Sequence, residues 1–345
     1  MTMMSDIEEA TRLTREGRLA EATALLRRAL SGAPEPAPAP MPSPFAPRRP
    51  RIFDVSPETG DATAEGARFL SLNCRTAAGS RDYRLFIPAR PLPAPAPLVV
   101  MLHGCTQSPG DFAAGTRMNE LAEEQGFLVA YPAQAQGANA QKCWNWFNAA
   151  EQRRDGTEAS LIAAITRQVM RDHAVDPLRV CIAGLSAGGA AAAILGQAWP
   201  DIFAAVGVHS GLPVGAARDM PSAFAAMRQG AAAPPARRLV PTIVFHADQD
   251  ATVSPRNGDA VIAQQEAAAS GLRLVEERGR QPGGHAWTRR QRQDASGRPV
   301  LEQWVVHGGG HAWSGGAAAG SYTDPRGPDA SRAMLAFFAR QRLTR

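Results

Sequence analysis

The sequence predicts an α/β fold with a mostly parallel central sheet covered by helices on both faces. Short apolar runs with the length of buried strands alternate along the chain with longer segments of helical periodicity. Strands that alternate with helices in this way pair in parallel. One strand-to-helix junction carries the pentapeptide Gly184-Leu185-Ser186-Ala187-Gly188, whose small residues indicate a sharp turn.

The first 50 residues differ in character from the rest of the chain. Helical periodicity from about Asp6 to Leu30, interrupted at Gly17, predicts a short helical hairpin over residues 1–30. Closely spaced prolines, several alternating with alanine, predict an extended Pro/Ala-rich linker over residues 31–50. The α/β domain is therefore expected over residues 51–345. One hairpin cannot bury its own apolar face, so it is expected either to dock on the α/β domain or to bind a partner.

The elements of this domain follow in order. The first strand alternates apolar and polar residues, and several later ones are continuous apolar runs, as expected for strands buried on both faces. Strands are expected at Tyr83–Pro88, Pro97–Leu102, Phe127–Tyr131, Val180–Ala183, Ala204–His209, Thr242–His246, Arg273–Glu277 and Leu301–Val306. Helices are expected near Phe112–Gln125, Glu158–His173, Gly189–Trp199, Gly258–Ala269 and Asp329–Arg340. Ligands bind beyond the carboxyl ends of such strands.

Composition and charge argue against several classes of protein. The net charge is +5 and the arginines are scattered without interleaved aromatic residues, so no nucleic-acid partner is expected. No apolar run approaches the ~20 residues that span a bilayer. The polar, acidic start from Met1 to Glu9 does not resemble a secretory signal, so a cytoplasmic location is expected. The four cysteines lack Cys-x-x-Cys spacing, so no metal site is expected.

The pentapeptide indicates nucleophilic catalysis. Gly-x-Ser-x-Gly between a strand and a helix is the nucleophile elbow of an α/β-hydrolase, which makes Ser186 the expected nucleophile. A serine hydroxyl is a poor nucleophile at neutral pH and needs a histidine base and an acid that orients it. In this fold the three residues follow in the order serine, acid, histidine.

The acid is expected in the segment after Thr242–His246, where two aspartates compete. We favour Asp250, because Asp-x-x-Val is the turn in which this acid sits in esterases, and Asp248 remains the alternative.

For the base, His311 follows the last expected strand and precedes the last helix, where this fold needs it. His285 lies in a near-identical Gly-Gly-His-Ala-Trp string but is interpreted as a hairpin residue, and His307 as a strand-end residue. The oxyanion needs two backbone N–H donors, for which we expect Ala187, after the nucleophile, and Cys105, after the strand that ends at His103.

Six segments resemble the polyhydroxybutyrate depolymerase-type esterase family, which also contains feruloyl and acetylxylan esterases. The matching segments are Leu102-His103-Gly104-Cys105-Thr106-Gln107, Cys143-Trp144-Asn145-Trp146-Phe147, Gly184-Leu185-Ser186-Ala187-Gly188-Gly189, Ser210-Gly211-Leu212-Pro213, Asp250-Ala251-Thr252-Val253 and Gly310-His311-Ala312-Trp313-Ser314-Gly315-Gly316. The resemblance covers roughly residues 80–340. It implies a cofactor-independent serine carboxylic-ester hydrolase that cleaves short-chain 3-hydroxyalkanoate polyester or oligomers through an acyl-enzyme. The alternative is a feruloyl or acetylxylan-type esterase on plant-derived esters.

The resemblance carries further implications. Cys105 and Cys143 lie in matched motifs, so they either form a disulfide that fixes the oxyanion loop or remain free thiols. Trp144, Trp146 and Trp313 are expected to line the substrate groove, with burial in the core as the alternative. A polyester granule becomes a possible partner for the hairpin, and an extracellular location stays possible. Two positions depart from the family pattern. Ala247 stands where the family often has glycine, and Val214 stands where it often has an aromatic residue.

Two other classes fit the sequence less well. A peptidase of the prolyl-oligopeptidase type shares the order of the triad, but its propeller domain is not apparent. A binding protein built on a silent hydrolase domain would not need the complete set of Ser186, Asp250 and His311.

Overall fold

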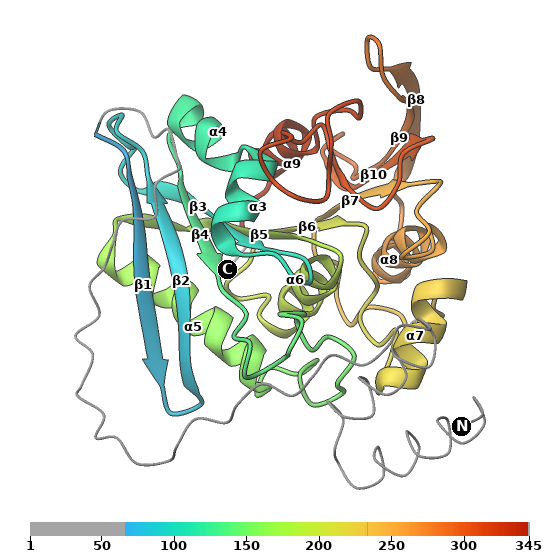
Figure 1. Ribbon diagram of the computed structural model, residues 1–345. Coiled ribbons are helices and arrows are strands. Elements are labelled where there is room, and N and C mark those ends of the chain that lie inside the picture. Colours follow the sequence, from blue (N-terminus) through green and yellow to red (C-terminus); the bar gives the residue numbers. More distant parts are fainter. Residues whose placement is uncertain (1–65, 233, 344–345) are drawn as a thin grey trace, which may run out of the picture. The chain divides into compact units, whose positions relative to one another are not determined.

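A ten-stranded sheet forms the centre of the computed structural model, which describes residues 66–232 and 234–343 (Figure 1). The expected hairpin over residues 1–30 and the linker over residues 31–50 lie outside the described residues. The strands are β1 (Arg68–Thr76), β2 (Gly79–Ile87), β3 (Ala96–Leu102), β4 (Leu128–Pro132), β5 (Val175–Leu185), β6 (Ala205–His209), β7 (Thr242–Ala247), β8 (Arg273–Arg280), β9 (Ala286–Gln293) and β10 (Pro299–His307).

The sheet is mostly parallel, as the sequence predicts. Its order is β1-β2-β4-β3-β5-β6-β7-β10-β9-β8. The six strands from β4 to β10 pair in parallel, and antiparallel pairs extend the sheet at both edges. The carboxyl ends of β3, β5, β7 and β10 therefore meet along one edge. A separate short pair joins β11 (Trp313–Ser314) to β12 (Thr323–Asp324).

Helices cover both faces of the sheet (Figure 1). They are α3 (Pro109–Thr116), α4 (Met118–Gln125), α5 (Thr157–Asp172), α6 (Ala187–Ala198), α7 (Met220–Gln229), α8 (Arg256–Glu266) and α9 (Ala330–Phe338). Two apolar clusters fill the two interfaces. One joins the sheet to α5, α6 and α8, and the other joins it to α3, α4 and α9.

Alternation along the strands explains the two clusters. On β3, Leu98 and Val100 belong to the first cluster, while Val99 and Met101 belong to the second. Successive side chains of a strand point to opposite faces, so a continuous apolar run supplies both interfaces.

Among the described residues no helix is long and apolar enough to cross a bilayer.

Several elements differ from the sequence-based expectations. The helix expected at Phe112–Gln125 is two helices, because Arg117 adopts a left-handed conformation with φ of 56° between them. Strands β1 and β9 and helix α7 were not expected. β1 is a largely exposed edge strand with few apolar residues. Helix α7 begins with a signal that sequence reasoning missed: Asp219 caps it through a capping box with Ser222, and Pro221 stands in its first turn.

Candidate active site

Ser186 occupies a strained turn between β5 and α6. Its φ of 57° and ψ of −119° lie in a region that L-residues rarely adopt. The flanking glycines make the turn possible, since a Cβ atom on Gly184 would lie 2.4 Å from the backbone of Gly188. The backbone N–H of Ser186 donates to the carbonyl oxygen of His209, at 2.8 Å, on the neighbouring strand β6. This geometry turns the serine side chain away from the sheet.

Asp250 and His311 meet at the carboxyl edge of the sheet. Asp250 follows β7 and His311 follows β10, and these strands are parallel neighbours. The Nδ1 atom of His311 lies 2.7 Å from Oδ2 of Asp250. The other carboxylate oxygen, Oδ1, accepts hydrogen bonds from the backbone N–H groups of Thr252 and Val253 at 2.9 and 2.8 Å.

The electrostatics of Asp250 favour its charged form. Burial alone would raise the pKa of the Asp250 carboxyl, but hydrogen bonds from His246 and His311 hold that pKa well below its ordinary value. A carboxylate that stays charged can orient an imidazole and stabilise the imidazolium. The Ser186 hydroxyl makes no hydrogen bond to His311 in the described part of the chain, and such contacts often tighten only around substrate.

The competing aspartate and histidines form pairs of their own. Asp248 Oδ2 lies 2.9 Å from Nδ1 of His307, whose Nε2 lies 2.9 Å from the Thr288 hydroxyl. His285 Nε2 lies 2.8 Å from Asp324 Oδ2. None of these residues borders the cavity that contains Ser186 and His311. The two aspartates of the acid loop therefore pair with two different histidines.

The residues of the expected oxyanion donors line the same cavity as Ser186. Ala187 is the first residue of α6, so its N–H has no acceptor within the helix. The N–H of Cys105 donates no hydrogen bond among the described residues. Gln107 supports this loop, because its Oε1 accepts from the N–H of Gly104 at 2.8 Å and its Nε2 donates to Asp111. Gln107 was not expected to contribute to the site.

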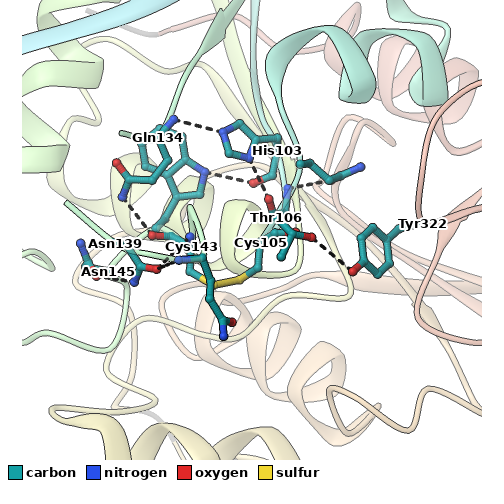
Figure 2. Close-up of a disulfide and its surroundings, with 12 residues drawn as sticks. His103, Cys105, Thr106, Gln134, Asn139, Cys143, Asn145 and Tyr322 are labelled. Atoms are coloured by element: carbon teal, nitrogen blue, oxygen red, sulfur yellow. Dashed lines mark hydrogen bonds between the residues drawn. A yellow bond between two sulfur atoms is a disulfide. The ribbon is translucent and has the colours of Figure 1, made fainter. Parts of the chain in front are cut away.

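A disulfide joins Cys105 to Cys143, so the first alternative drawn from the resemblance holds (Figure 2). The remaining cysteines, Cys74 and Cys181, are free and buried. Figure 2 also shows Tyr322 reaching the loop after β3, where its hydroxyl lies 3.3 Å from the Thr106 hydroxyl. The loop after β3 is thus held from two sides.

A cavity of about 350 Å³ borders two of the three expected triad residues, while Asp250 does not line it. Ser186, Ala187, His311 and the Cys105–Cys143 disulfide line it. The remaining wall is largely apolar and includes Trp146, Phe147, Leu185, Leu212, Met220, Ala223, Phe224, Met227, Val253 and Tyr322. Helix α7 contributes four of these side chains at helical spacing, so one face of an unexpected helix forms a wall of the site.

Two of the three tryptophans expected in the substrate groove lie elsewhere. Trp144 is fully buried and its indole N–H donates to the carbonyl oxygen of His103 at 3.0 Å. Trp313 is buried as well, stacks on His209 and donates to the Ser331 hydroxyl. Both therefore support the loops behind the site, which corrects the expectation for them. Trp146 borders the cavity, as expected.

Two buried histidines behind the site remain neutral. Burial lowers the pKa of His209 to about 3 and that of His103 to about 4. The His209 Nε2 accepts from the N–H of Ser314, and the His103 Nε2 accepts from the N–H of Gln134. These rings fix neighbouring loops in place. No cluster of three or more His, Cys, Asp or Glu that could hold a metal ion occurs within the described residues.

Comparison with known proteins shows to which family this chain belongs. The family model described as Esterase PHB depolymerase matches residues 81–275. Poly(3-hydroxyalkanoate) depolymerase C of Paucimonas lemoignei is 35% identical over 187 residues, which cover 50% of this chain and 45% of that protein. Feruloyl esterase B of Thermothelomyces thermophilus is 31% identical over 128 residues, 37% of this chain and 43% of that one. This chain thus matches less than half the length of either curated relative.

A solved structure of an acetyl xylan esterase from Aspergillus awamori aligns with a TM-score of 0.58 at 19% identity, over 75% of this chain and 94% of that one. The sheet, the turn at Ser186 and this likeness define the protein as an α/β-hydrolase. The family model covers more than half of the sequence. The chain belongs to the Esterase PHB depolymerase family, which confirms the resemblance read from its motifs.

Proposed function

We propose that the protein is a serine carboxylic-ester hydrolase that works through an acyl-enzyme. In this proposal Ser186 is the nucleophile, His311 the general base and Asp250 the acid that orients the histidine. The observation that carries the proposal is the 2.7 Å contact between Asp250 and His311 beside the cavity that also contains Ser186. The family membership and the esterase relatives agree with it.

The reaction follows from these positions. The Ser186 oxygen bonds to the ester carbonyl carbon while its proton moves to Nε2 of His311, and the N–H groups of Cys105 and Ala187 hold the oxyanion. Asp250 stabilises the imidazolium. His311 then returns the proton to the leaving alcohol as the ester bond breaks. Water, deprotonated by the same histidine, cleaves the acyl-enzyme and releases the carboxylic acid.

The apolar rim of the cavity, formed by the exposed side chains of Met220, Phe224 and Tyr322, favours an apolar polyester substrate. Four large hydrophobic side chains of the described residues are strongly exposed, and three of them, Met220, Phe224 and Tyr322, line this cavity. Exposed apolar surface of this kind marks a binding site. Short-chain 3-hydroxyalkanoate oligomers present methyl and methylene groups to such a wall, whereas an acetylated sugar needs polar partners. We therefore propose oligomers or polyester of 3-hydroxyalkanoates as the substrate class.

A feruloyl ester is the second candidate. Trp146 and Phe147 lie edge to face in the cavity wall, with ring centroids 5.9 Å apart. An aromatic acyl group could join such a pair with favourable geometry. The aromatic pair therefore supports an aryl ester independently of the α7 side chains.

One assay separates the two candidates. Hydrolysis of a soluble 3-hydroxybutyrate oligomer and of methyl ferulate is measured side by side, with Ser186→Ala as the blank. Higher kcat/KM on the oligomer supports the polyester proposal, and higher kcat/KM on the ferulate supports the aryl ester. Ser186→Ala is expected to lower kcat by several orders of magnitude with folding intact. Undiminished hydrolysis by this variant would refute the serine mechanism itself.

The rim can be tested on its own. Phe224→Ala removes an apolar side chain from the cavity rim, and Leu274→Ala removes one of comparable exposure on β8, away from the cavity. We expect Phe224→Ala to raise KM for the oligomer several-fold and Leu274→Ala to leave it unchanged. Equal KM values for both variants and the unmodified protein would remove the support that the rim gives to the polyester proposal.

The disulfide bears on where the protein works. Disulfides persist in oxidising compartments and are rare in the cytosol. The Cys105–Cys143 bridge therefore favours an oxidising compartment over the cytoplasmic location expected from the first residues. Trapping of free thiols while producing cells are lysed directly into denaturant, so that the buried Cys74 and Cys181 also react, followed by mass measurement, tests this. Four trapped thiols per chain would favour the cytoplasm.

A further inference from the structure

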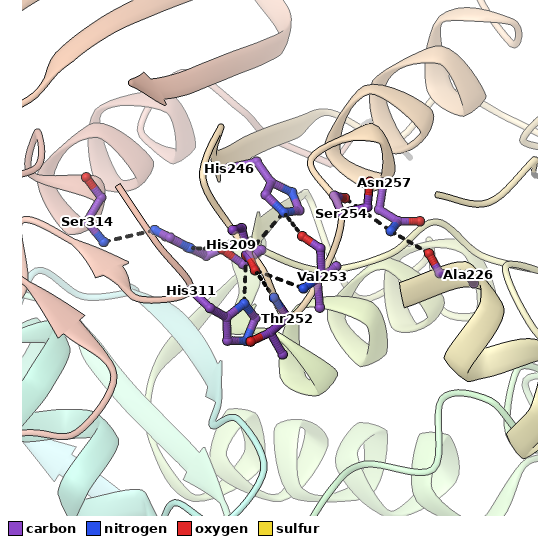
Figure 3. Close-up of polar contacts among 11 residues, drawn as sticks. His209, Ala226, His246, Thr252, Val253, Ser254, Asn257, His311 and Ser314 are labelled. Atoms are coloured by element: carbon purple, nitrogen blue, oxygen red, sulfur yellow. Dashed lines mark hydrogen bonds and ion pairs between the residues drawn. The ribbon is translucent and has the colours of Figure 1, made fainter. Parts of the chain in front are cut away.

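Two histidines approach the carboxylate of Asp250 from different sides. His311 Nδ1 lies 2.7 Å from Oδ2, and His246 Nε2 lies 3.3 Å from the same oxygen. In Figure 3 the rings of His246 and His311 lie on opposite sides of the point where their dashed lines converge. The proposed mechanism uses only His311. His246 is a buried ring in direct contact with the acid and has no assigned role.

The hydrogen-bond partners of His246 define which nitrogen donates. Its Nε2 lies 2.9 Å from the carbonyl oxygen of Val253, which can only accept, so Nε2 carries the hydrogen. Oδ2 of Asp250 lies 3.3 Å from the same Nε2. Nδ1 is buried and has no partner among the described residues. The ring therefore donates toward the turn that contains Asp250 and Val253.

The surroundings hold the ring in this orientation. His246 lies on β7 opposite Val305 of β10 and is almost fully buried. Gly258 of α8 packs against its other edge, where a Cβ atom would lie 2.9 Å from Nδ1 and 3.0 Å from the His246 Cβ. Asn257, the neighbour of Gly258, anchors the helix by donating to the carbonyl oxygens of Ala226 and Ser254. The ring thus has little room to rotate.

We propose that His246 is a positioning residue for the catalytic acid. Its Nε2–H binds the carbonyl oxygen of Val253 and Oδ2 of Asp250 together, so that Oδ2 stays directed at the Nδ1–H of His311. The inference rests on the proposed role of Asp250. Without His246, Oδ1 keeps its two backbone hydrogen bonds, but the carboxylate can rotate so that Oδ2 moves away from His311. Displacements of about 1 Å in a catalytic constellation can lower rates on the order of a hundredfold.

A matched pair of variants tests this role. Glutamine places an amide N–H near the position of Nε2, whereas methionine has nearly the same shape and no donor. We expect His246→Met to lower kcat about ten- to a hundredfold with KM nearly unchanged, and His246→Gln to keep most of the kcat. The low-field proton resonance of His311 Nδ1–H should shift or broaden in His246→Met and persist in His246→Gln. Equal loss of kcat in both variants would overturn the inference.

Gly258→Ala provides a second variant should His246→Met fail to fold. Its new methyl group pushes on the His246 ring from behind, and we expect kcat to fall while KM is kept. In a His246→Gln background the same substitution should lower kcat by a smaller factor, because the flexible amide can shift away. An equal fall in kcat in both backgrounds would overturn the inference.

The failure of this inference can be told from the failure of the proposed function. Inactive Asp250→Asn together with full kcat in His246→Met would overturn the positioning role and leave the triad standing. Full activity of Asp250→Asn would refute the proposed acid itself.

Discussion

Gly188 packs against the end of β3 so closely that a Cβ atom on it would lie 2.1 Å from the carbonyl oxygen of Leu102. The contact joins the first turn of α6 to β3, the strand that precedes Cys105. The helix can approach the neighbouring strand this far because residue 188 has no side chain. The same approach brings the N–H of Ala187 and the loop that contains Cys105 to one cavity.

Gly188→Ala should therefore destabilise the fold. The added methyl group meets backbone atoms, which cannot move aside as a flexible side chain can, and overpacking of this kind costs about 1–3 kcal/mol. Chemical denaturation monitored by circular dichroism measures the change in the free energy of unfolding. Gly137→Ala is the control, because a Cβ atom there meets nothing within 4 Å. Equal stability of the two variants would contradict the prediction.

Asp250→Asn and Asp248→Asn should differ sharply in activity. Asn at position 250 presents an uncharged amide to His311 and cannot stabilise the imidazolium, so we expect kcat to fall about 10³- to 10⁴-fold. Asp248 contacts His307 instead, and its Asn variant should stay within about tenfold of the unmodified protein. Steady-state kinetics on a soluble ester decide the matter. A larger loss in Asp248→Asn would exchange the roles of the two aspartates.

Stability should fall as the pH is lowered from neutral. The pKa values of His209 and His103 are about 3 and about 4 in the fold, below the ordinary 6.5. Below 6.5 the unfolded chain binds protons that these buried rings do not, so the free energy of unfolding falls with pH, by up to about 1.4 kcal/mol per pH unit for each ring.

Urea unfolding between about pH 7 and about pH 5 measures this slope, a range that largely avoids the ordinary carboxyl pKa values. In His209→Gln one of the two rings is gone, and the slope should be shallower. An unchanged slope would show that protonation of His209 does not drive the acid sensitivity.

Loss of the disulfide should impair catalysis more than binding. Cys143→Ser frees the loop that supplies the N–H of Cys105, and the loss of an oxyanion donor lowers kcat by about 10²- to 10³-fold. Because the loop keeps its contact with Gln107, we expect a smaller loss, about tenfold, with KM nearly unchanged. Cys74→Ala, which removes a buried thiol that does not line the cavity, should retain its kcat. A reduced Cys143→Ser variant with full kcat would argue against Cys105 as a donor.

Much of the fold was predictable because its parallel strands are continuous apolar runs. β3 and β5 are buried on both faces, so their sequences carry a strong signal. β1 gave a weak signal because an exposed edge strand needs few apolar residues. Arg117 divides one expected helix into two through its left-handed backbone, and no glycine or proline at that position marks the break.

The tryptophans show that a family motif does not predict which of its side chains face the cavity. Trp144 and Trp146 lie two residues apart in one string, yet Trp144 is buried against His103 and Trp146 borders the cavity. The loop that carries them is irregular, so no periodicity tells which side chain faces inward. The near-identical strings around His285 and His311 likewise gave no local sign of which histidine meets Asp250.

The sequence by itself determined the turn at Ser186 and most of the strands and helices around it. Both depend on contacts between near neighbours in the chain: small residues at 184 and 188 for the turn, apolar runs for the strands. Only the tertiary structure decided which aspartate meets which histidine, and that helix α7 lines the cavity. Asp250 and His311 are 61 residues apart, and they meet because β7 and β10 pair in parallel with their carboxyl ends in register. Such pairing is a property of the folded sheet, because it joins segments about 60 residues apart in the chain, and no local pattern of residues specifies that contact.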